Sequence, residues 1–586
     1  MMSAFLLLVL CSLAPAALSV PPRPPVRCGS DGDGDAGCVL SNAYGAWSSD
    51  RADCPVAAVA YPASERDVVA AVARASAGGM RVKAVSGFAH TIPKLACPGG
   101  GGNGSAASLL ISTTRYAGVE VDAAARTVTA DAGAPLRAVI DAAEASGLSL
   151  PASPYWEGVS VGGAVSTGSH GSSWWGRGGA LHDHVVRLSL VVPAGAADGW
   201  ARVVPLAKGD ALFPAALVSL GLLGVISKVT LALEPRFKRS VTYDYRDDST
   251  FQDDFANHAA RHEFADIAWY PSQHQAVYRL DDRAPLNATG DGVNDFIGFR
   301  STLIAVSQGV RALETALEGS RNVKGKCAMA TAEIAAKRLI GNGLRRKDGQ
   351  PFIGYPVVGF QGKMQTSGSC ARPPASSPLT ACAWDPRFKG LFFYESTAIF
   401  SPARFRSFVL DVKKLRDLNP DGMCGVDVYN GLLVRFVRRS EAWLGQPEDS
   451  VVVDFNYYRA ADPSAARLSQ DVWEEVEQLA FVKHGARPHW AKNRMVAFRG
   501  VQGKYPGWAR FAAAKRQLDP RGLFDSPWSE DVVGGKELSK DDGCALDGRC
   551  VCSEDRHCSP GQGYYCGTGL VFSEARVCRY SASQLV

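Results

Sequence analysis

The stretch EGVSVGGAVSTGSHGSSWWGRGG, residues 157–179, is dense in glycine and serine and carries few charges. A folded chain uses such a stretch where its backbone must approach another group closely, because only glycine lacks the Cβ atom that would collide. Backbone N–H groups in such turns can also cradle phosphates. A plain surface loop is the alternative. The G-x-G-x-x-G spacing of a Rossmann dinucleotide site is absent. We therefore predict phosphate contact without a Rossmann fold.

Strand and helix patterns alternate around this stretch. VAAVAYP (56–62) has the apolar run of a strand. SERDVVAAVARASAGG (64–79) has the spacing of a helix that starts at the N-cap Ser64 and stops at two glycines. Residues 118–133 alternate apolar and polar side chains about a short turn, which predicts a hairpin. Residues 209–235 have the pattern of a helix that runs into a strand. These patterns predict one α+β domain over residues 51–235.

The chain has 586 residues, and single hydrophobic cores stop growing beyond about 250–300 residues. Residues 236–535 are less regular and richer in aromatic side chains, with strand patterns such as KGLFFYESTAIF (389–400) and VVVDFNYY (451–458). We predict a second α+β domain there. Residues 20–50 form an irregular lead-in, and residues 536–586 a cysteine-rich tail.

Charge and hydropathy limit which partners and which cellular compartment are expected. Lys and Arg number 63 against 58 Asp and Glu, and no long basic run occurs, so nucleic acid is not an expected partner. Residues 1–19 hold a short apolar run followed by small residues, which is typical of a cleaved secretory signal. A buried N-terminal helix or strand is the alternative. No later segment reaches the roughly 18 uninterrupted apolar residues of a membrane span.

The cysteines favour the same compartment. There are 15, of which Cys11 lies in the signal and six crowd the tail between Cys544 and Cys578. A tail this short is expected to be held by disulfides, in a pairing that the sequence leaves open. A metal site is the rival, but CVC does not match a C-x2-C knuckle, so we expect none. Asn103 and Asn287 begin glycosylation sequons. The expected destination is extracellular or apoplastic, with the vacuole as an alternative.

Three motifs then carry a resemblance. VKAVSGFAHT (82–91), GVSVGGAVSTGSHG (158–171) and LVSLGLLGVISKVTLALEP (217–235) have the order and spacing found in the FAD-binding domain of vanillyl-alcohol-oxidase-type flavoproteins, the PCMH type. The box RPHWAKNR (487–494) resembles that of the sugar-1,4-lactone oxidoreductases, and the tail looks like that of the plant L-gulonolactone oxidases. The resemblance covers almost the whole mature chain, and it implies that residues 236–535 bind the substrate.

The resemblance implies FAD as the cofactor. In animal enzymes of this family a loop histidine is bonded to the flavin 8α-methyl group, and His90 falls on that position. Phe88 and Ala89 depart from the two small residues that usually precede it. A histidine that only contacts FAD is the alternative. The positions implied to contact FAD are Ser86, Gly87, Phe88, Ala89, His90, Thr91, Gly162, Gly163, Ser166, Thr167, Gly168, His170, Gly224 and Ile226.

The resemblance also implies catalytic residues. Lys492 would stabilise the negative charge that a hydride leaves on the flavin. His489 would orient flavin or substrate, with a packed core histidine as the alternative, and Trp490 would be structural. Family members carry an arginine in a Glu-x-Arg strand; Arg435 in GLLVRFVRR matches it, but Leu433 stands at the acidic position. Another carboxylate must serve, or the substrate pocket differs.

The implied reaction is oxidation of an aldono-1,4-lactone at C2, with O2 or another acceptor taking the electrons. For L-gulono-1,4-lactone the 2-keto product would enolise to ascorbate. Three alternatives stay open. The first is another carbohydrate or alditol oxidase of the same fold, and the second a secreted cytokinin dehydrogenase, which would lack the His-Trp-x-Lys box. The third is a non-catalytic binding protein on a flavoprotein scaffold. Protein partners are not predicted.

Overall fold

The computed structural model describes residues 25–28, 36–41, 53–87, 93–99, 107–348, 354–371, 380–382, 392–424, 426–428, 430–460, 462, 464–536 and 539–584. Several predictions lie outside these residues: the signal over 1–19, most of the lead-in, the loop residues Phe88, Ala89, His90 and Thr91, and the sequon at Asn103. Within the described ranges, no helix combines the length and apolar character needed to cross a bilayer.

The first sheet has the strand order β1 (Val26–Arg27), β2 (Ala36–Ser41), β3 (Asp53–Ala60), β5 (Ser108–Ser112), β4 (Arg81–Val85). Strands β3 and β4 both run parallel to β5. Helix α2 (Glu65–Gly78) connects β3 to β4. Its caps are those predicted: the Ser64 side chain accepts a hydrogen bond from the Asp67 N–H, and Gly79 closes the helix at φ 61°. Short helix α3 (Pro93–Ala96) follows β4.

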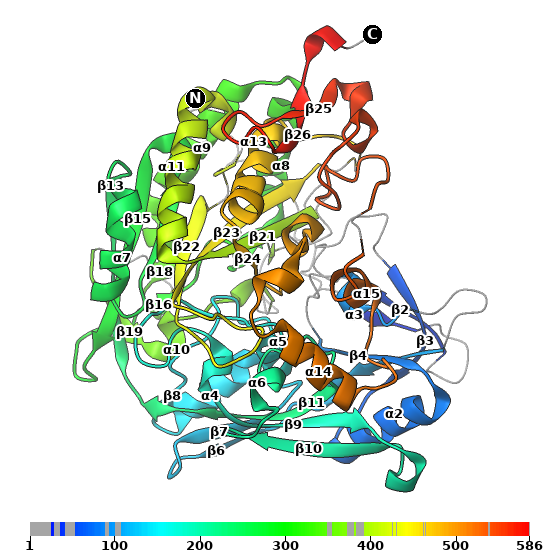
Figure 1. Ribbon diagram of the computed structural model, residues 1–586. Coiled ribbons are helices and arrows are strands. Elements are labelled where there is room, and N and C mark those ends of the chain that lie inside the picture. The colour runs from blue at the N-terminus through cyan, green and yellow to red at the C-terminus, as the bar shows by residue number, and fades with distance from the viewer. Residues whose placement is uncertain are drawn as a thin grey trace.

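A second, antiparallel sheet has the order β10 (Ala201–Ala207), β9 (Val185–Pro193), β11 (Val225–Ala232), β7 (Thr127–Asp131), β6 (Val119–Asp122). Helix α2 packs on both sheets, because Val68 and Leu109 share a buried cluster with Val191. Helices α4 (Leu136–Ala145) and α5 (Val161–Ser166) follow the β6–β7 hairpin, and β8 (Leu148–Ser149) pairs with β12 (Glu234–Pro235). Both sheets lie at the bottom of Figure 1.

The helix predicted at the start of 209–235 is almost absent. Only α6 (Phe213–Ala216) forms before strand β11. Leu220 and Gly221 have positive φ angles of 55° and 60°, and Gly224 has a φ of 149°. These angles are incompatible with a right-handed helix. The apolar run therefore became a folded turn whose backbone faces the cavity described below.

An eight-stranded antiparallel sheet dominates the rest of the chain. Its order is β19 (Val357–Phe360), β13 (Lys238–Asp247), β15 (Gln275–Ala284), β14 (Asp266–Tyr270), β22 (Leu432–Val437), β23 (Ser450–Arg459), β21 (Phe392–Phe400), β24 (Arg487–Pro488). Helices α7 (Phe251–Arg261), α11 (Pro402–Leu418) and α13 (Gln470–Gln478) cover one face (Figure 1). That face is apolar: Trp269, Phe405 and Phe455 share one core cluster. The other face is left to line the cavity.

Smaller elements complete this second unit. Two helices, α8 (Ile304–Gly319) and α9 (Val323–Leu339), form a hairpin beside two-stranded pairs β16 (Val293–Asn294) with β18 (Leu344–Arg345) and β17 (Thr302–Leu303) with β20 (Thr380–Ala381). Helices α10 (Gln361–Met364) and α12 (Pro420–Met423) are single turns. Disulfide Cys327–Cys424 joins α9 to the end of α12, and Cys370–Cys382 links two residues 12 positions apart.

The chain then returns to the first unit. Helices α14 (Trp508–Leu518) and α15 (Pro527–Val532) lie beside its elements in Figure 1. The Val82 N–H donates to the Leu523 carbonyl across 2.8 Å, and Phe524 joins the buried cluster around α2. Residues near 520 thus support the first sheet, although they belong to the predicted 236–535 segment. The predicted bounds at 50, 235 and 535 stay predictions.

The tail is held by disulfides, as predicted, and it ends in a β-hairpin. Its six cysteines pair as Cys544–Cys550, Cys552–Cys566 and Cys558–Cys578. Strands β25 (Tyr564–Thr568) and β26 (Arg576–Tyr580) form the hairpin, which lies above α13 in Figure 1. The Glu474 carboxylate on α13 accepts the Cys578 N–H at 2.6 Å, and Glu475 accepts the N–H groups of Leu570, Val571 and Phe572. Disulfides Cys28–Cys38 and Cys54–Cys97 tie the N-terminal strands.

Candidate active site

A cavity of about 480 Å³ lies between the two units. One wall comes from β4, α5 and the turn at 219–226 of the first unit, and the other from the free face of the eight-stranded sheet. Side chains alternate between faces along a strand. Asp266 on β14, Leu433 and Arg435 on β22, and Asp454 on β23 therefore point into the cavity, while their sequence neighbours face the helices.

Most of the predicted cofactor positions lie on the first wall. The described residues of that prediction that line the cavity are Ser86, Gly162, Gly163, Ser166, Thr167, His170, Gly224 and Ile226. Gly87 and Gly168 are described but do not line it. Gly162 is required by packing: a Cβ atom there would lie 2.8 Å from the Ala132 Cβ and 3.0 Å from the Ala132 carbonyl oxygen. The glycine lets α5 pack against the turn after β7.

His170 presents an unused acceptor to the cavity. Its Nδ1 atom lies 2.7 Å from the Gly171 carbonyl, to which it donates, and its buried Nε2 atom has no partner among the described residues. Burial lowers the pKa of His170 well below its ordinary value, and the Arg435 charge lowers it further. The ring is therefore neutral, with a lone pair on Nε2. Ser219 Oγ on the same wall is also buried without a partner in the described chain.

Lys83 is a wall residue that sequence reasoning missed. It is buried on β4, and its Nζ donates to the Gly221 carbonyl at 3.1 Å. Burial lowers the pKa of Lys83 to about 7, against the raising effect of Asp525. FAD combines a pyrophosphate anion with hydroxyl and N–H donors. A buried amine, a free hydroxyl and a free imidazole acceptor on one wall fit that set of groups.

Two cations and two carboxylates meet on the opposite wall. Lys492 Nζ lies 2.5 Å from Glu395 Oε2 and 4.0 Å from Asp454 Oδ1. Arg435 forms an ion pair with Asp454 through Nη2 and donates through Nη1 to the His170 carbonyl at 3.1 Å. Thr397 Oγ1 donates to Asp454 Oδ1 at 2.5 Å. Two carboxylates, from β21 and β23, therefore lie on the cavity wall that carries Leu433.

The two carboxylates differ in their surroundings. Burial would raise the pKa of Asp454, but the charges of Arg435 and Lys492 hold it below its ordinary value. Burial raises the pKa of Glu395; the Lys492 charge opposes this shift and the Asp454 charge adds to it. The same cluster therefore contains one firmly ionised acid and one acid that binds a proton more readily.

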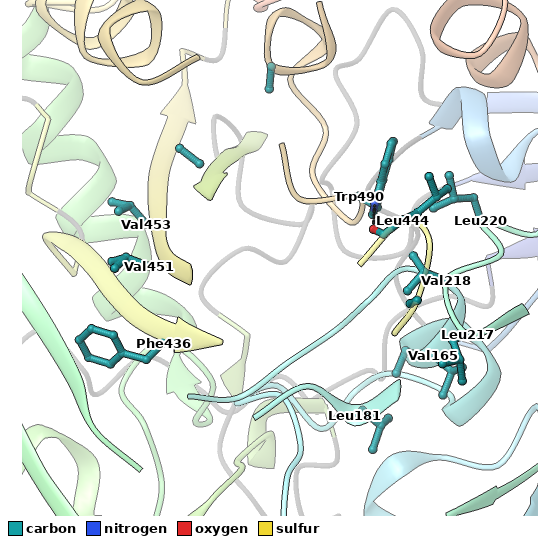
Figure 2. Packing of buried hydrophobic residues seen from close by; sticks show 14 of the residues in the cluster. Val165, Leu181, Leu217, Val218, Leu220, Phe436, Leu444, Val451, Val453 and Trp490 are labelled. Atoms are coloured by element: carbon teal, nitrogen blue, oxygen red, sulfur yellow. Dashed lines mark hydrogen bonds between the residues drawn. The ribbon is translucent and has the colours of Figure 1, made fainter. Parts of the chain in front are cut away.

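His489 and Trp490 of the predicted His-Trp-x-Lys box have different surroundings. The His489 ring lies 5.0 Å from the His170 ring, and its Nδ1 accepts the Ala491 N–H at 3.1 Å. Burial, with the Lys492 charge, lowers the pKa of His489 to about 3, so the ring is neutral. Trp490 does not line the cavity; it is buried in the core beside Leu444 and Leu220 (Figure 2). Its Nε1 donates to the Leu444 carbonyl at 2.9 Å, which agrees with a structural role.

Tyr155 closes the cavity between the walls. Its hydroxyl donates to Asp266 Oδ2 at 2.6 Å, and its ring lies 5.5 Å from the Arg435 guanidinium carbon. Arg279 approaches Asp266 at 3.7 Å. Sequence reasoning missed Tyr155, Glu395 and Asp454. For the two acids a signal existed: each is a lone charge inside an otherwise apolar strand pattern, and such residues are rarely buried without a partner.

Comparison with known proteins identifies the family. Family models match residues 56–197 (FAD binding domain), 412–532 (D-arabinono-1,4-lactone oxidase) and 541–580 (L-gulonolactone oxidase 2-like, C-terminal domain). "L-gulonolactone oxidase 3" of Arabidopsis thaliana is 56% identical over 97% of this chain and 96% of its own. "L-gulonolactone oxidase 5" of the same plant is 42% identical over the same shares.

A solved structure confirms the fold. A solvent-stable cholesterol oxidase superposes with a TM-score of 0.63 over 88% of this chain and 100% of its own, at 16% identity. The α+β architecture, with an FAD-binding unit of the PCMH type and a second unit, is therefore the predicted one. An FAD-binding domain, the His-Trp-x-Lys box and the disulfide-bonded tail all occur in one chain with full-length relatives. The chain belongs to the L-gulonolactone oxidase family and is an FAD-dependent oxidoreductase that acts on CH–OH groups.

Proposed function

We propose that this protein oxidises L-gulono-1,4-lactone at C2, with O2 as the acceptor and hydrogen peroxide as the second product. The resulting 2-keto lactone enolises to L-ascorbate. One observation carries the proposal: Lys492 and Arg435 face the FAD-binding wall across a single cavity. The names of the full-length relatives, which are called L-gulonolactone oxidases, support the substrate.

Residues on the two walls of the cavity supply groups that would bind FAD and groups that would stabilise negative charge during the reaction. FAD, when bound, accepts the hydride that leaves the substrate carbon. Lys83, Ser219 and His170 would hold it from the first wall. Lys492 and Arg435 place two positive charges in a water-poor cavity, where they stabilise developing negative charge more strongly than in water. Arg435 is fixed by Asp454 and the His170 carbonyl, and its buried Nε has no partner among the described residues, so it can donate to a substrate oxygen.

The first experiment is spectroscopic. Purified secreted protein should be yellow, and L-gulono-1,4-lactone should bleach the flavin absorbance under anaerobic conditions. Air should restore the colour and release one equivalent of hydrogen peroxide per lactone oxidised. If the protein is yellow and the lactone bleaches it, but air does not reoxidise it, the lactone stays the substrate and the electron acceptor is a compound other than O2. Yellow protein that no lactone bleaches would overturn the proposal.

A second candidate, oxidation of another carbohydrate or an alditol, is favoured by one observation. Leu433 lines the cavity where an acidic residue was expected, so the polar groups that face the substrate differ in position. Values of kcat/KM for a panel of aldonolactones, sugars and alditols decide between the two. A non-catalytic scaffold is set aside, because the family and the cation pair at the cavity both belong to an oxidoreductase.

Covalent attachment of FAD through His90 stays a proposal. Acid precipitation tests it directly: flavin fluorescence in the pellet indicates a covalent bond, and His90→Ala should move the flavin to the supernatant. Flavin in the supernatant of the unaltered protein would leave His90 as a contact residue only.

Secretion is likewise proposed. It is supported by the apolar N-terminal run and by seven disulfides that pair all 14 cysteines after residue 20, since disulfides persist in oxidising compartments. Asn287 is exposed in the loop after β15, as a glycan site requires. N-terminal sequencing and glycosidase digestion of the protein from culture medium test both points; an intact residue 1 in an intracellular protein would contradict secretion.

A further inference from the structure

We propose that Glu395 is the general base that removes the substrate hydroxyl proton during oxidation. The inference rests on the proposed function and names a group for a step that the family resemblance leaves without one. Glu395 lies on β21 and lines the cavity, where its carboxylate contacts Lys492 at 2.5 Å. The reacting hydroxyl must lie between the FAD-binding wall and this sheet, which is where that carboxylate is presented.

Register places Glu395 beside the other site residues. On adjacent strands Glu395 pairs with Asn456, and Thr397 pairs with Asp454. Asp454 in turn pairs with Leu433 on β22. Glu395 therefore lies two residues along β21 from the position opposite Asp454, so its side chain is on the same face of the sheet as Asp454 and Arg435. The Asn493 side chain accepts the Glu395 backbone N–H at 2.9 Å, which fixes the strand to the segment that carries Lys492.

The two acids of the cluster differ in their freedom to take a proton. Asp454 is held by Arg435, by the Thr397 hydroxyl and by Lys492, and all three favour its ionised form. Glu395 has Lys492 as the cation in contact with it. When environments push the pKa values of two neighbouring acids apart, the acid with the raised pKa is the one suited to proton transfer. Burial and the Asp454 charge raise the pKa of Glu395.

Two histidines are the rivals. His489 is excluded because its Nδ1 accepts the Ala491 N–H and its ring also bonds the Gly168 backbone. His170 has a free Nε2 in the cavity, but burial and the adjacent Arg435 charge disfavour its protonated form. A proton placed on His170 would sit beside a fixed cation. A proton placed on Glu395 neutralises an anion instead.

The proton and electron balance is complete. The substrate O–H bond breaks and its proton passes to a Glu395 oxygen, while the C–H electron pair leaves as hydride to bound FAD and a C=O bond forms. Neutral Glu395 no longer balances Lys492, so the site becomes one charge more positive when the cofactor becomes more negative.

The test compares Glu395→Gln with the unaltered protein. The amide keeps the shape and can still accept from Lys492, but it cannot act as a base. We expect the rate of anaerobic flavin bleaching by the lactone to fall by about 10²–10⁴-fold, the usual contribution of a general base. Flavin content, flavin spectrum and the Kd of a non-oxidisable lactone analogue should stay within about threefold of the unaltered protein. The bleaching rate should also lose its rise with pH, because that rise reports ionisation of Glu395 facing Lys492, Asp454 and Arg435.

Asp427→Asn is the matched control. Asp427 is also buried with a pKa raised by burial, to about 7, and its carboxylate accepts the Ser272 N–H and hydroxyl without lining the cavity. Its substitution should change neither rate nor pH profile. Bleaching of Glu395→Gln at the rate of the unaltered protein would overturn the assignment, and so would a slow variant that keeps the unaltered pH profile. Loss of that profile in His170→Ala alone would transfer the role to His170. If no lactone bleaches the unaltered flavoprotein, the proposed function itself fails.

Discussion

Arg494 and Glu477 form a buried, two-pronged ion pair directly behind the cavity wall. Arg494 donates to Glu477 at 2.7 and 2.6 Å, and the same carboxylate accepts the Ser396 hydroxyl at 2.6 Å. Arg494 follows Lys492 by two positions, and Ser396 follows Glu395 by one. The pair therefore joins the two segments that carry the Lys492–Glu395 contact. Gly548 of the tail packs on the Arg494 guanidinium and accepts the Val496 N–H at 2.9 Å.

Gly548→Ala should destabilise this support. A Cβ atom at Gly548 would lie 2.6 Å from Arg494 Cζ, so Arg494 must move. Overpacking of this kind costs about 1–3 kcal/mol. Thermal unfolding should shift down by several degrees, and kcat should fall because Lys492 loses its fixed position. Gly543→Ala is the control, since Gly543 has the same left-handed φ with nothing within 4 Å. Equal Tm values for the two variants would contradict a supporting role for the tail.

The tail should also make stability depend on pH. Burial raises the pKa of Glu474 to about 8, against the lowering effect of the Cys578 N–H, whereas an unfolded glutamate has a pKa of about 4.3. The folded protein binds this proton more tightly, so its contribution to stability is complete below about pH 4.3 and is lost as pH rises through about 8. Glu474→Gln should flatten the fall in Tm between these limits. An unchanged Tm profile in that variant would show that Glu474 is ionised in the fold.

Lys83→Met should weaken FAD binding. Hydrogen bonds to charged groups contribute about 1.5–3 kcal/mol, which corresponds to a rise in Kd of about tenfold to a hundredfold. The measurement is a fluorescence titration with FAD in a His90→Ala background, where flavin is not covalently held. Lys208→Met is the control, because Lys208 is 64% exposed and pairs only loosely with Glu441 at 3.5 Å. An unchanged Kd for Lys83→Met would remove Lys83 from the cofactor site.

Lys492→Met should separate catalysis from binding. Methionine keeps the length of the side chain but removes the charge that stabilises the transition state. We expect kcat to fall by about 10²–10³-fold, as for loss of one preorganised electrostatic donor, with flavin content unchanged. Loss of the cation also lets burial raise the pKa of Glu395 further, so any remaining pH profile should move to higher pH. A variant with normal kcat would show that Lys492 acts only as a structural partner of Glu395.

The sequence by itself determined several local elements and placed small residues where one wall of the cavity forms. Helix α2 forms between Ser64 and Gly79 because a capping serine and a terminating glycine satisfy its end groups locally. The glycine-rich stretch contains Ser160 as the N-cap of α5 and the small residues that line the cavity. The cysteine content of the tail likewise determined that it would be held by disulfides.

Tertiary structure alone decided the chemistry of the opposite wall. Glu395, Asp454 and Arg435 meet because β21, β23 and β22 are neighbours in the sheet, and their register follows from hydrogen bonds between segments far apart in the chain. A strand pattern shows that a lone acid is present, but not which cation it will face. The helical pattern at 209–235 was overridden for the same reason: the long-range fold around the cavity requires positive φ angles at Leu220 and Gly221, and local helix preference is weaker than that packing.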